Sequence, residues 1–224
     1  MKLNVGCGED LMPDPWVNLD KTLPERDDID DFNTLSFDLG ICTLGEQLPF
    51  EDNSVDEILM SHVLEHLSNP LDVMEELHRV AVADALCTVK LPYGSSDSAW
   101  EDPDHKRPYF LQSFEYFGQP CYHKADYGYR GDWMVKSRIL IIDQNNRFAQ
   151  GAVGPNGELD LEELMITVQH ARNIVAEFYV ELLCVKPIRP RIREMGKASP
   201  VSFHLFESGD EPPVACGTGV IPRQ

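Results

Sequence analysis

Two glycines and a downstream acid are the first residues whose spacing suggests binding chemistry. Gly6 and Gly8 follow the short run Lys2 to Val5, and Asp20 ends a second run that begins at Trp16. A glycine directly after a strand lets the backbone approach a ligand, because no side chain blocks it. A carboxylate at the end of the next strand can accept hydrogen bonds from ribose hydroxyls. Together these residues predict a site for a ribose-containing ligand, although each feature alone also fits an ordinary turn.

A second pattern suggests metal chemistry. His62-Val63-Leu64-Glu65-His66 spells the His-x-x-Glu-His motif of inverted zinc proteases, in which two histidines on a helix bind zinc and the glutamate activates water. The motif directly follows Asp56 to Met60, which is typical of a strand, whereas a metal pair needs a helix and a third ligand. We therefore keep a zinc-dependent hydrolase using His62, Glu65 and His66 as an alternative, and expect no resident metal.

Short apolar runs separated by turn residues predict the strands that position these groups. The predicted strands are Lys2 to Val5, Trp16 to Asp20, Leu35 to Leu39, Val55 to Met60, Ala85 to Leu91, Val135 to Ile142 and Ile174 to Val185. Ser68-Asn69-Pro70 starts a helix in which Leu71, Met74, Leu77 and Val80 recur at helical spacing. Strands alternating with helices predict an α/β fold with a doubly wound, mostly parallel sheet. The link between the first two strands is too short for a full crossover helix.

A length of 224 residues suits a single domain, which we place at residues 1–190. Residues 95–130 are polar and aromatic, with at most one helix near Leu111 to Phe117. Residues 144–173 form an insertion with a helix over Leu159 to Ala171. Residues 191–224 form a C-terminal tail, and beyond Ala198 we find no strong periodicity and expect a mobile or weakly docked segment.

Charge and composition limit the partners. The formal net charge of −19 opposes a broad basic surface for nucleic-acid phosphates, so a nucleic acid ranks last among possible partners. No apolar run is long enough for a membrane helix and no secretory signal opens the chain, so we expect a cytoplasmic protein without membrane attachment. The six cysteines lack paired spacing, which predicts free thiols. The sequence leaves the oligomeric state open.

Several motifs in order resemble the class I S-adenosylmethionine-dependent methyltransferases, particularly small proteins of the methyltransferase-11-like type. The matching segments are Leu3 to Gly8, Trp16 to Asp20, Asp38-Leu39, Leu48 to Asp56, Ser61 to Leu67 and Asp102 to Arg107. The resemblance implies a seven-stranded Rossmann-like sheet closed by an antiparallel hairpin, formed here by Val135 to Ile142 and Ile174 to Val185. Asn4 stands where many relatives carry an acid, and Asp10 where many carry a third glycine.

The resemblance also implies S-adenosyl-L-methionine as cofactor and a role for each matched position. Gly6 and Gly8 would cradle the methionine part, with Asn4 and Cys7 beside them. Asp20 would hold the ribose. Asp38 and Leu39 would lie near the adenine. Ser61 and His62 would line the methionine side and face the acceptor.

Methyl transfer requires mainly that an acceptor lone pair be aligned behind an activated carbon. A hydroxyl or protonated amine acceptor also needs a base, and histidine titrates near neutral pH. His105 is our leading candidate and His62 the second. Residues 95–130 would select the acceptor, with a small molecule or sugar preferred. A cofactor-binding protein without turnover would share every cofactor residue and stays open as an alternative.

Overall fold

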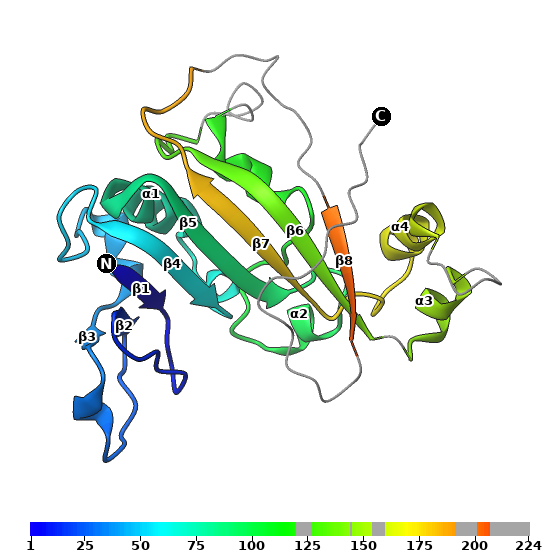
Figure 1. Cartoon of the computed structure of the whole chain (residues 1–224), viewed down its shortest axis with the longest axis horizontal. Coiled ribbons are helices and arrows are strands. Elements are labelled where there is room, and N and C mark those ends of the chain that lie inside the picture. The colour runs from blue at the N-terminus through cyan, green and yellow to red at the C-terminus, as the bar shows by residue number, and fades with distance from the viewer. Residues whose placement is uncertain (120–126, 144, 154–159, 191–200, 207–224) are drawn as a thin grey trace.

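A computed structural model describes residues 1–119, 127–143, 145–153, 160–190 and 201–206, in which one mixed sheet organises the chain (Figure 1). The strand order is β3-β2-β1-β4-β5-β7-β6-β8. The strands are β1 (Lys2–Val5), β2 (Trp16–Asp20), β3 (Thr34–Ser36), β4 (Val55–Ser61), β5 (Ala81–Pro92), β6 (Trp133–Asp143), β7 (Glu177–Cys184) and β8 (Val201–Phe206). The carboxyl ends of β1, β2 and β4 meet at one edge of the sheet, since these strands pair in parallel.

The α/β class, the mostly parallel sheet and the closing hairpin are confirmed. Strands β1 to β5 pair in parallel, and β7 pairs antiparallel with both β5 and β6. The expectation that nothing regular follows Ala198 is wrong, because β8 adds an eighth strand parallel to β6. Strand β3 is also shorter than predicted, because the chain enters a 3-10 turn at Leu39–Leu44. The rest of the predicted tail, residues 191–200 and 207–224, lies outside the described residues.

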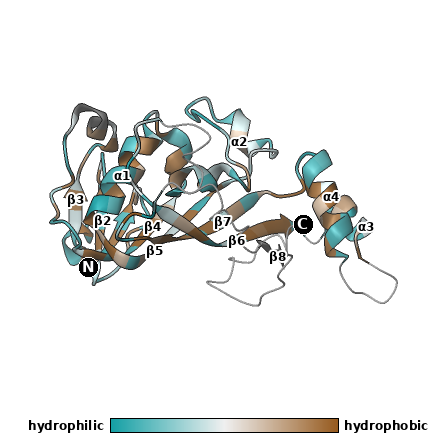
Figure 2. Cartoon of the chain, turned by 90° about the horizontal axis from the view of Figure 1, so that it is seen from above, coloured by the Kyte–Doolittle hydropathy of each residue, from teal (hydrophilic) through white to brown (hydrophobic). Residues whose placement is uncertain are grey.

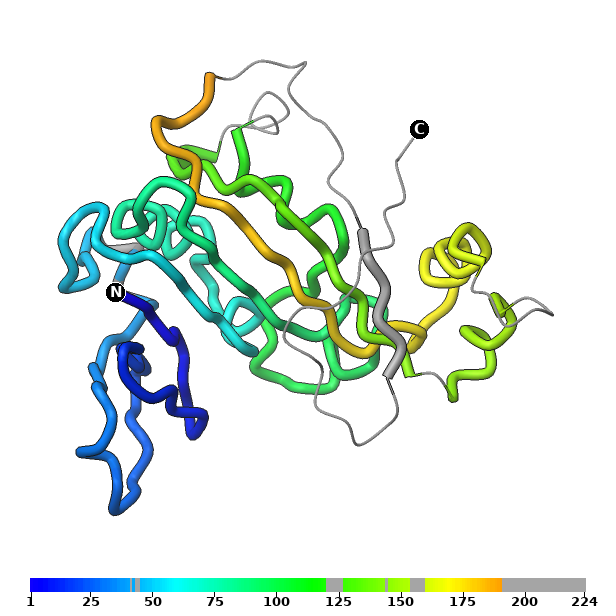
Figure 3. The backbone as a smooth tube through the Cα atoms, in the orientation of Figure 1, coloured from blue at the N-terminus to red at the C-terminus, as the bar shows by residue number. Residues whose placement is uncertain are grey.

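Helical cover is sparse for a fold of this class. The helices are α1 (Pro70–Val80), α2 (Ser98–Glu101), α3 (Arg147–Gly151) and α4 (Leu161–His170). Helix α1 begins with proline in its first turn, as predicted, and buries Val73, Met74, Leu77 and Val80. The helix expected near Leu111 to Phe117 is a 3-10 turn, Ser113–Phe117. Helix α4 lies where the sequence predicts a helix, within Leu159 to Ala171, and the tube in Figure 3 shows α3 and α4 beyond the end of β6.

In the β5 and β7 part of the sheet the core lies on one face. Alternate residues of β7, including Phe178, Val180 and Leu182, are buried there, and Figure 2 shows α1 and α2 above this sheet. Trp133 closes the layer by donating from Nε1 to the carbonyl of Met74 at 2.9 Å. On the other face, polar side chains such as Glu181 are only half-buried. Helices α1 and α2 therefore cover this side of the sheet.

Candidate functional site

The glycine turn after β1 has the backbone shape that only glycine adopts without strain. Gly6 has φ +66 and Gly8 has φ +49. The amides of Gly6 and Cys7 both donate to the carbonyl of Leu19, at 2.7 and 3.2 Å. A Cβ at Gly6 would overlap the Val63 side chain, whereas one at Gly8 would meet nothing within 4 Å. The turn therefore packs at Gly6 against Val63, just after β4, and faces open space at Gly8.

Asp20 lies beside this turn, as predicted. Its Oδ2 accepts from the amide of Gly8 at 3.0 Å, and its Oδ1 accepts from the amide of Thr22 at 3.0 Å. Each carboxylate oxygen has a second lone pair that these bonds leave available. The carboxylate is thus held in place with acceptor capacity to spare, which suits a ligand with two neighbouring hydroxyls such as a ribose.

Asn4 is bonded to the loop that joins β1 to β2. Its Nδ2 donates to the carbonyl of Asp10 at 2.7 Å and to Asn18 Oδ1 at 2.9 Å. Buried Asn18 also accepts from the amide of Met12 at 2.7 Å and donates to the carbonyl of Met12 at 2.9 Å. Residues 6–15, all of them described, contain no helix. The two asparagines therefore hold the loop that stands in place of a crossover helix.

Asp38 and Leu39 follow β3, next to the end of β2. Asp38 accepts from the amide of Gly40 at 2.9 Å and pairs with Lys21 Nζ at 2.8 Å, and Lys21 lowers the pKa of the Asp38 carboxyl. The register pairs Asp20 with Ser36, which brings this segment near the ribose candidate. Burial, with the nearby Asp20 charge, raises the pKa of the Cys7 thiol to about 11, so Cys7 is a neutral wall residue.

His62 directly follows Ser61 at the end of β4 and has φ +54. Its Nε2 lies 3.1 Å from Glu177 Oε1, and its Nδ1 lies 3.3 Å from Glu65 Oε1. These carboxylates, Glu177 first, raise the pKa of His62 to about 9. A base needs an unprotonated nitrogen with room for a proton, and both nitrogens of His62 face carboxylates. The arrangement does not suit His62 as a base.

The structure also contradicts the alternative of an inverted zinc-protease site. His62 lies before the 3-10 turn Leu64–His66, which is three residues long, so His62 and His66 do not share a helix. Instead, His66 Nδ1 lies 3.0 Å from Asp104 Oδ2. A hydrolase built on a helical His62 and His66 pair has no support here.

His105 reaches this region from the loop after α2. The amide of Lys106 donates to the carbonyl of Glu65 at 2.7 Å, which fixes the loop to the end of β4. The His105 and His66 rings are 4.7 Å apart between centroids. The structure thus brings His105 together with Glu65 and His66. It also adds Glu177 of β7, which the sequence analysis missed because β7 is remote in the chain and no motif marks it.

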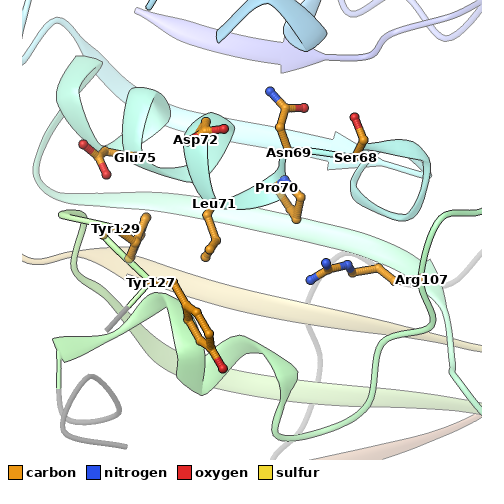
Figure 4. Close-up of a pocket in the computed structure, with 10 residues that line it drawn as sticks. Ser68, Asn69, Pro70, Leu71, Asp72, Glu75, Arg107, Tyr127 and Tyr129 are labelled. Carbon is orange, nitrogen blue, oxygen red and sulfur yellow. The ribbon is translucent and has the colours of Figure 1, made fainter. Parts of the chain in front are cut away.

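A cavity of about 510 Å³ lies between the start of α1 and the loop that carries Arg107 (Figure 4). In this view Arg107 reaches toward Leu71, and Tyr127 lies beneath Leu71. Asp72 and Glu75 of α1 complete a charged and aromatic lining. A neighbouring cavity of about 420 Å³ shares Leu71, Arg107 and Tyr127. Residues of the predicted acceptor segment therefore line real cavities.

Cys7, Cys42, Cys87 and Cys184 are free thiols, as predicted, while Cys121 and Cys216 lie outside the described residues. Within the described part of the chain, no helix is both long and apolar enough to cross a bilayer.

Comparison with known proteins connects the fold and the turn to one family. Residues 3–89 match the family model described as a methyltransferase domain. A SAM-dependent methyltransferase from Archaeoglobus fulgidus has 14% identity and a TM-score of 0.51, over 81% of this chain and 85% of that chain. The Haloferax volcanii complex of the Trm112 methyltransferase activator with a putative methyltransferase has 15% identity and a TM-score of 0.50, over 84% of this chain and 83% of that chain. No curated protein sequence matches the chain.

At these identities the two structures show a shared fold, and the family model adds the matched segment that contains the glycine turn, Asp20 and His62. The residues present fit the cofactor, since the turn is open at Gly8 and Asp20 retains free acceptor capacity. Over residues 3–89 the chain is similar to the methyltransferase-domain family, and the whole chain shares its fold with a SAM-dependent methyltransferase.

Proposed function

We propose that this enzyme methylates a small molecule or a sugar held beside the carboxyl ends of β1 and β4. The observation that carries the donor half is the Asp20 carboxylate, fixed by two backbone amides next to the open Gly8 turn. Asn4 supports the cofactor from behind by holding the loop. The residues proposed to contact the cofactor are Gly6, Cys7, Gly8, Asp20, Asp38, Leu39, Ser61 and His62.

The acceptor half of the proposal rests on the cavity in Figure 4. Its lining combines the Arg107 guanidinium, the carboxylates of Asp72 and Glu75, and the ring of Tyr127. Several donors and acceptors beside an aromatic face suit a polar, hydroxyl-rich molecule of modest size. The net charge of −19 disfavours a nucleic acid as acceptor.

Methyl transfer requires little chemistry from the side chains. The bound cofactor supplies a methyl group on a positively charged sulfur. The chain must orient the acceptor and, for a hydroxyl or amine, provide a proton acceptor. His105 Nδ1 contacts the carbonyl of Ala99 at 3.2 Å, which leaves Nε2 for the acceptor side. His105 is therefore the better candidate for that task than His62, whose nitrogens are both engaged.

Calorimetry with S-adenosylhomocysteine, the demethylated product, tests the donor half. Asp20→Ala should weaken binding by about ten- to a hundredfold, because hydrogen bonds to a charged group contribute roughly 1.5–3 kcal/mol each. The matched control is Asp30→Ala, an exposed acid in the turn Ile29–Asp31. An unchanged affinity in Asp20→Ala would overturn the ribose assignment.

A second measurement tests the acceptor half. His105→Ala should keep the affinity for S-adenosylhomocysteine nearly intact and slow turnover on an acceptor found by screening hydroxyl- and amine-bearing small molecules and sugars. Loss of cofactor binding in His105→Ala would instead place this residue in the cofactor site or in the structural framework.

A further inference from the structure

Three potential ligand side chains converge where the loop after α2 meets the end of β4. A carboxylate oxygen of Glu65 and a ring nitrogen of each of His66 and His105 all lie within 4.8 Å of one another. The amide of Lys106, next to His105, donates to the carbonyl of Glu65 at 2.7 Å, so the backbone itself ties the two segments together. The cluster shares Glu65 and His66 with the predicted His-x-x-Glu-His motif and contains His105 where that motif has His62.

Glu65 is a buried acid whose carboxylate oxygens accept no hydrogen bond from the residues described. It is 2% exposed. His62 Nδ1 forms an ion pair with Oε1 at 3.3 Å, but His62 also serves Glu177 through its other nitrogen. A buried carboxylate oxygen without a partner costs free energy unless a cation or donor reaches it. Glu65 Oε2 therefore points to a ligand with positive charge.

The two histidines are oriented in the way that metal ligands usually are. A ligating histidine commonly donates its other ring N–H to a carboxylate or a backbone carbonyl, which fixes the tautomer. His66 Nδ1 lies 3.0 Å from Asp104 Oδ2, and His105 Nδ1 lies 3.2 Å from the carbonyl of Ala99. In both rings Nε2 is left as the nitrogen with a free lone pair.

We propose that Glu65, His66 and His105 bind one divalent transition-metal ion of the zinc class, through the Glu65 carboxylate and the two Nε2 atoms. Two imidazoles and one carboxylate form the ligand set of open zinc sites, in which a fourth position takes water or substrate. Magnesium and calcium prefer ligand sets made of oxygen. Asp102, whose Oδ2 lies 3.9 Å from His105 Nε2, is the nearest further carboxylate.

The fourth position would accept an oxygen of the methyl acceptor, and this last step rests on the proposed function. In the metal-bound state His105 Nε2 is a ligand and not a base. A bound metal would lower the pKa of that hydroxyl, as zinc does for water, so that its proton could pass to solvent water before the oxygen takes the methyl group and the sulfur–methyl bond breaks.

The test uses the full-length, untagged protein after removal of metal with a chelator and dialysis. Titration with Zn²⁺ alone should give one ion per chain by calorimetry. Co²⁺ should give the visible absorption of a four-coordinate site without the near-ultraviolet thiolate band, because the ligand set contains no sulfur. This spectrum separates the site from the free thiols, which would bind the same ions.

His66→Gln and His105→Gln should each weaken Zn²⁺ binding at least tenfold, and Asp104→Asn should weaken it by about tenfold through loss of the Nδ1 partner. The matched control is His170→Gln on α4, where Nδ1 contacts only the carbonyl of Ile166 among the interactions described. This change should leave Zn²⁺ affinity unaltered. Circular dichroism of each variant separates ligand loss from unfolding.

Wild-type protein that binds no stoichiometric Zn²⁺ would overturn the proposal, and so would a thiolate band with Co²⁺ or a Zn²⁺ affinity that folded His66→Gln and His105→Gln both retain. In the first case the cation that pairs with Glu65, among the residues described, is His62. Binding of S-adenosylhomocysteine in the presence of chelator reports on the proposed function separately, so either conclusion can fail while the other stands.

Discussion

Replacement of Gly6 by alanine tests the contact between the glycine turn and the end of β4. An alanine at φ +66 adopts the left-handed backbone at a cost of roughly 1–2 kcal/mol. Its Cβ would also overlap Val63 Cγ2 and lie 3.1 Å from Val63 Cγ1, and such overpacking costs roughly 1–3 kcal/mol. We therefore expect Gly6→Ala to lower the free energy of unfolding by roughly 2–5 kcal/mol.

Gly8→Ala is the matched control. Gly8 has φ +49, so it imposes a similar backbone strain, but its added Cβ would meet nothing within 4 Å. We expect a loss of only about 1–2 kcal/mol. The smaller unfolded-state entropy of alanine stabilises both variants alike and cancels in the comparison. Urea unfolding in the absence of cofactor measures both values.

A second change isolates the steric part. Val63→Ala removes both γ-methyl groups and leaves Val63 Cβ at 3.2 Å from the new atom, a contact that small shifts can relieve. The double variant should therefore be more stable than the two single losses predict, by roughly 0.5–3 kcal/mol. Equal losses for Gly6→Ala and Gly8→Ala, with no coupling to Val63, would refute the packing of β4 onto the turn.

Three further changes probe the framework around the site. Asn18→Ala should cost roughly 1–3 kcal/mol in urea unfolding, because Asn4 and Met12 lose buried partners; an unchanged midpoint would contradict the loop clamp. Burial lowers the pKa of His78, so the unfolded chain takes up the proton at a higher pH than the folded protein does. The free energy of unfolding therefore falls as the pH drops below the unfolded-state pKa of about 6.5. The stability difference between wild type and His78→Gln should therefore depend on pH over that range, and a constant difference would be the opposing result. Asp132→Ala should cost roughly 3–5 kcal/mol by calorimetric unfolding, because the fully buried carboxylate holds Arg189 through three nitrogens; a loss below about 1 kcal/mol would mean that water replaces the ion pair.

The sequence predicts the parts of the fold that local patterns encode. The seven apolar runs became strands, since burial on one face of a sheet requires them, and Asn69-Pro70 marked the start of α1. Strand β8 was missed even though Val201 to Phe206 alternates apolar and polar residues, because a six-residue run near the end of a polar tail was read as irregular. The 3-10 turn Ser113–Phe117 was read as a helix, since five residues are too few to separate the two periods.

The candidate site also contains residues that local spacing predicts and residues that it does not. Gly6, Gly8 and Asp20 could be found because they come from consecutive strands and their spacing is local. The contacts of His62 with Glu177 and of Glu65 with His105 could not, because Glu177 comes from an antiparallel strand and His105 from a loop, and no sequence motif states where either lies. Asn4 was placed by family position, and only its contacts show that it holds the loop.

The difference between residues inside and outside the matched segment affects the search for the acceptor. The residues proposed to bind the methyl donor lie within residues 3–89, the segment that the family model matches, whereas Arg107, Tyr127 and His105 lie beyond it. The bond from the Lys106 amide to the Glu65 carbonyl fixes the loop that carries His105 and Arg107 against the end of β4. The proposed acceptor cavity therefore combines Asp72 and Glu75 from the matched segment with Arg107 and Tyr127 from beyond it. The family match over residues 3–89 consequently bears on the methyl donor, while the acceptor has to be inferred from the charges and rings that line the cavity.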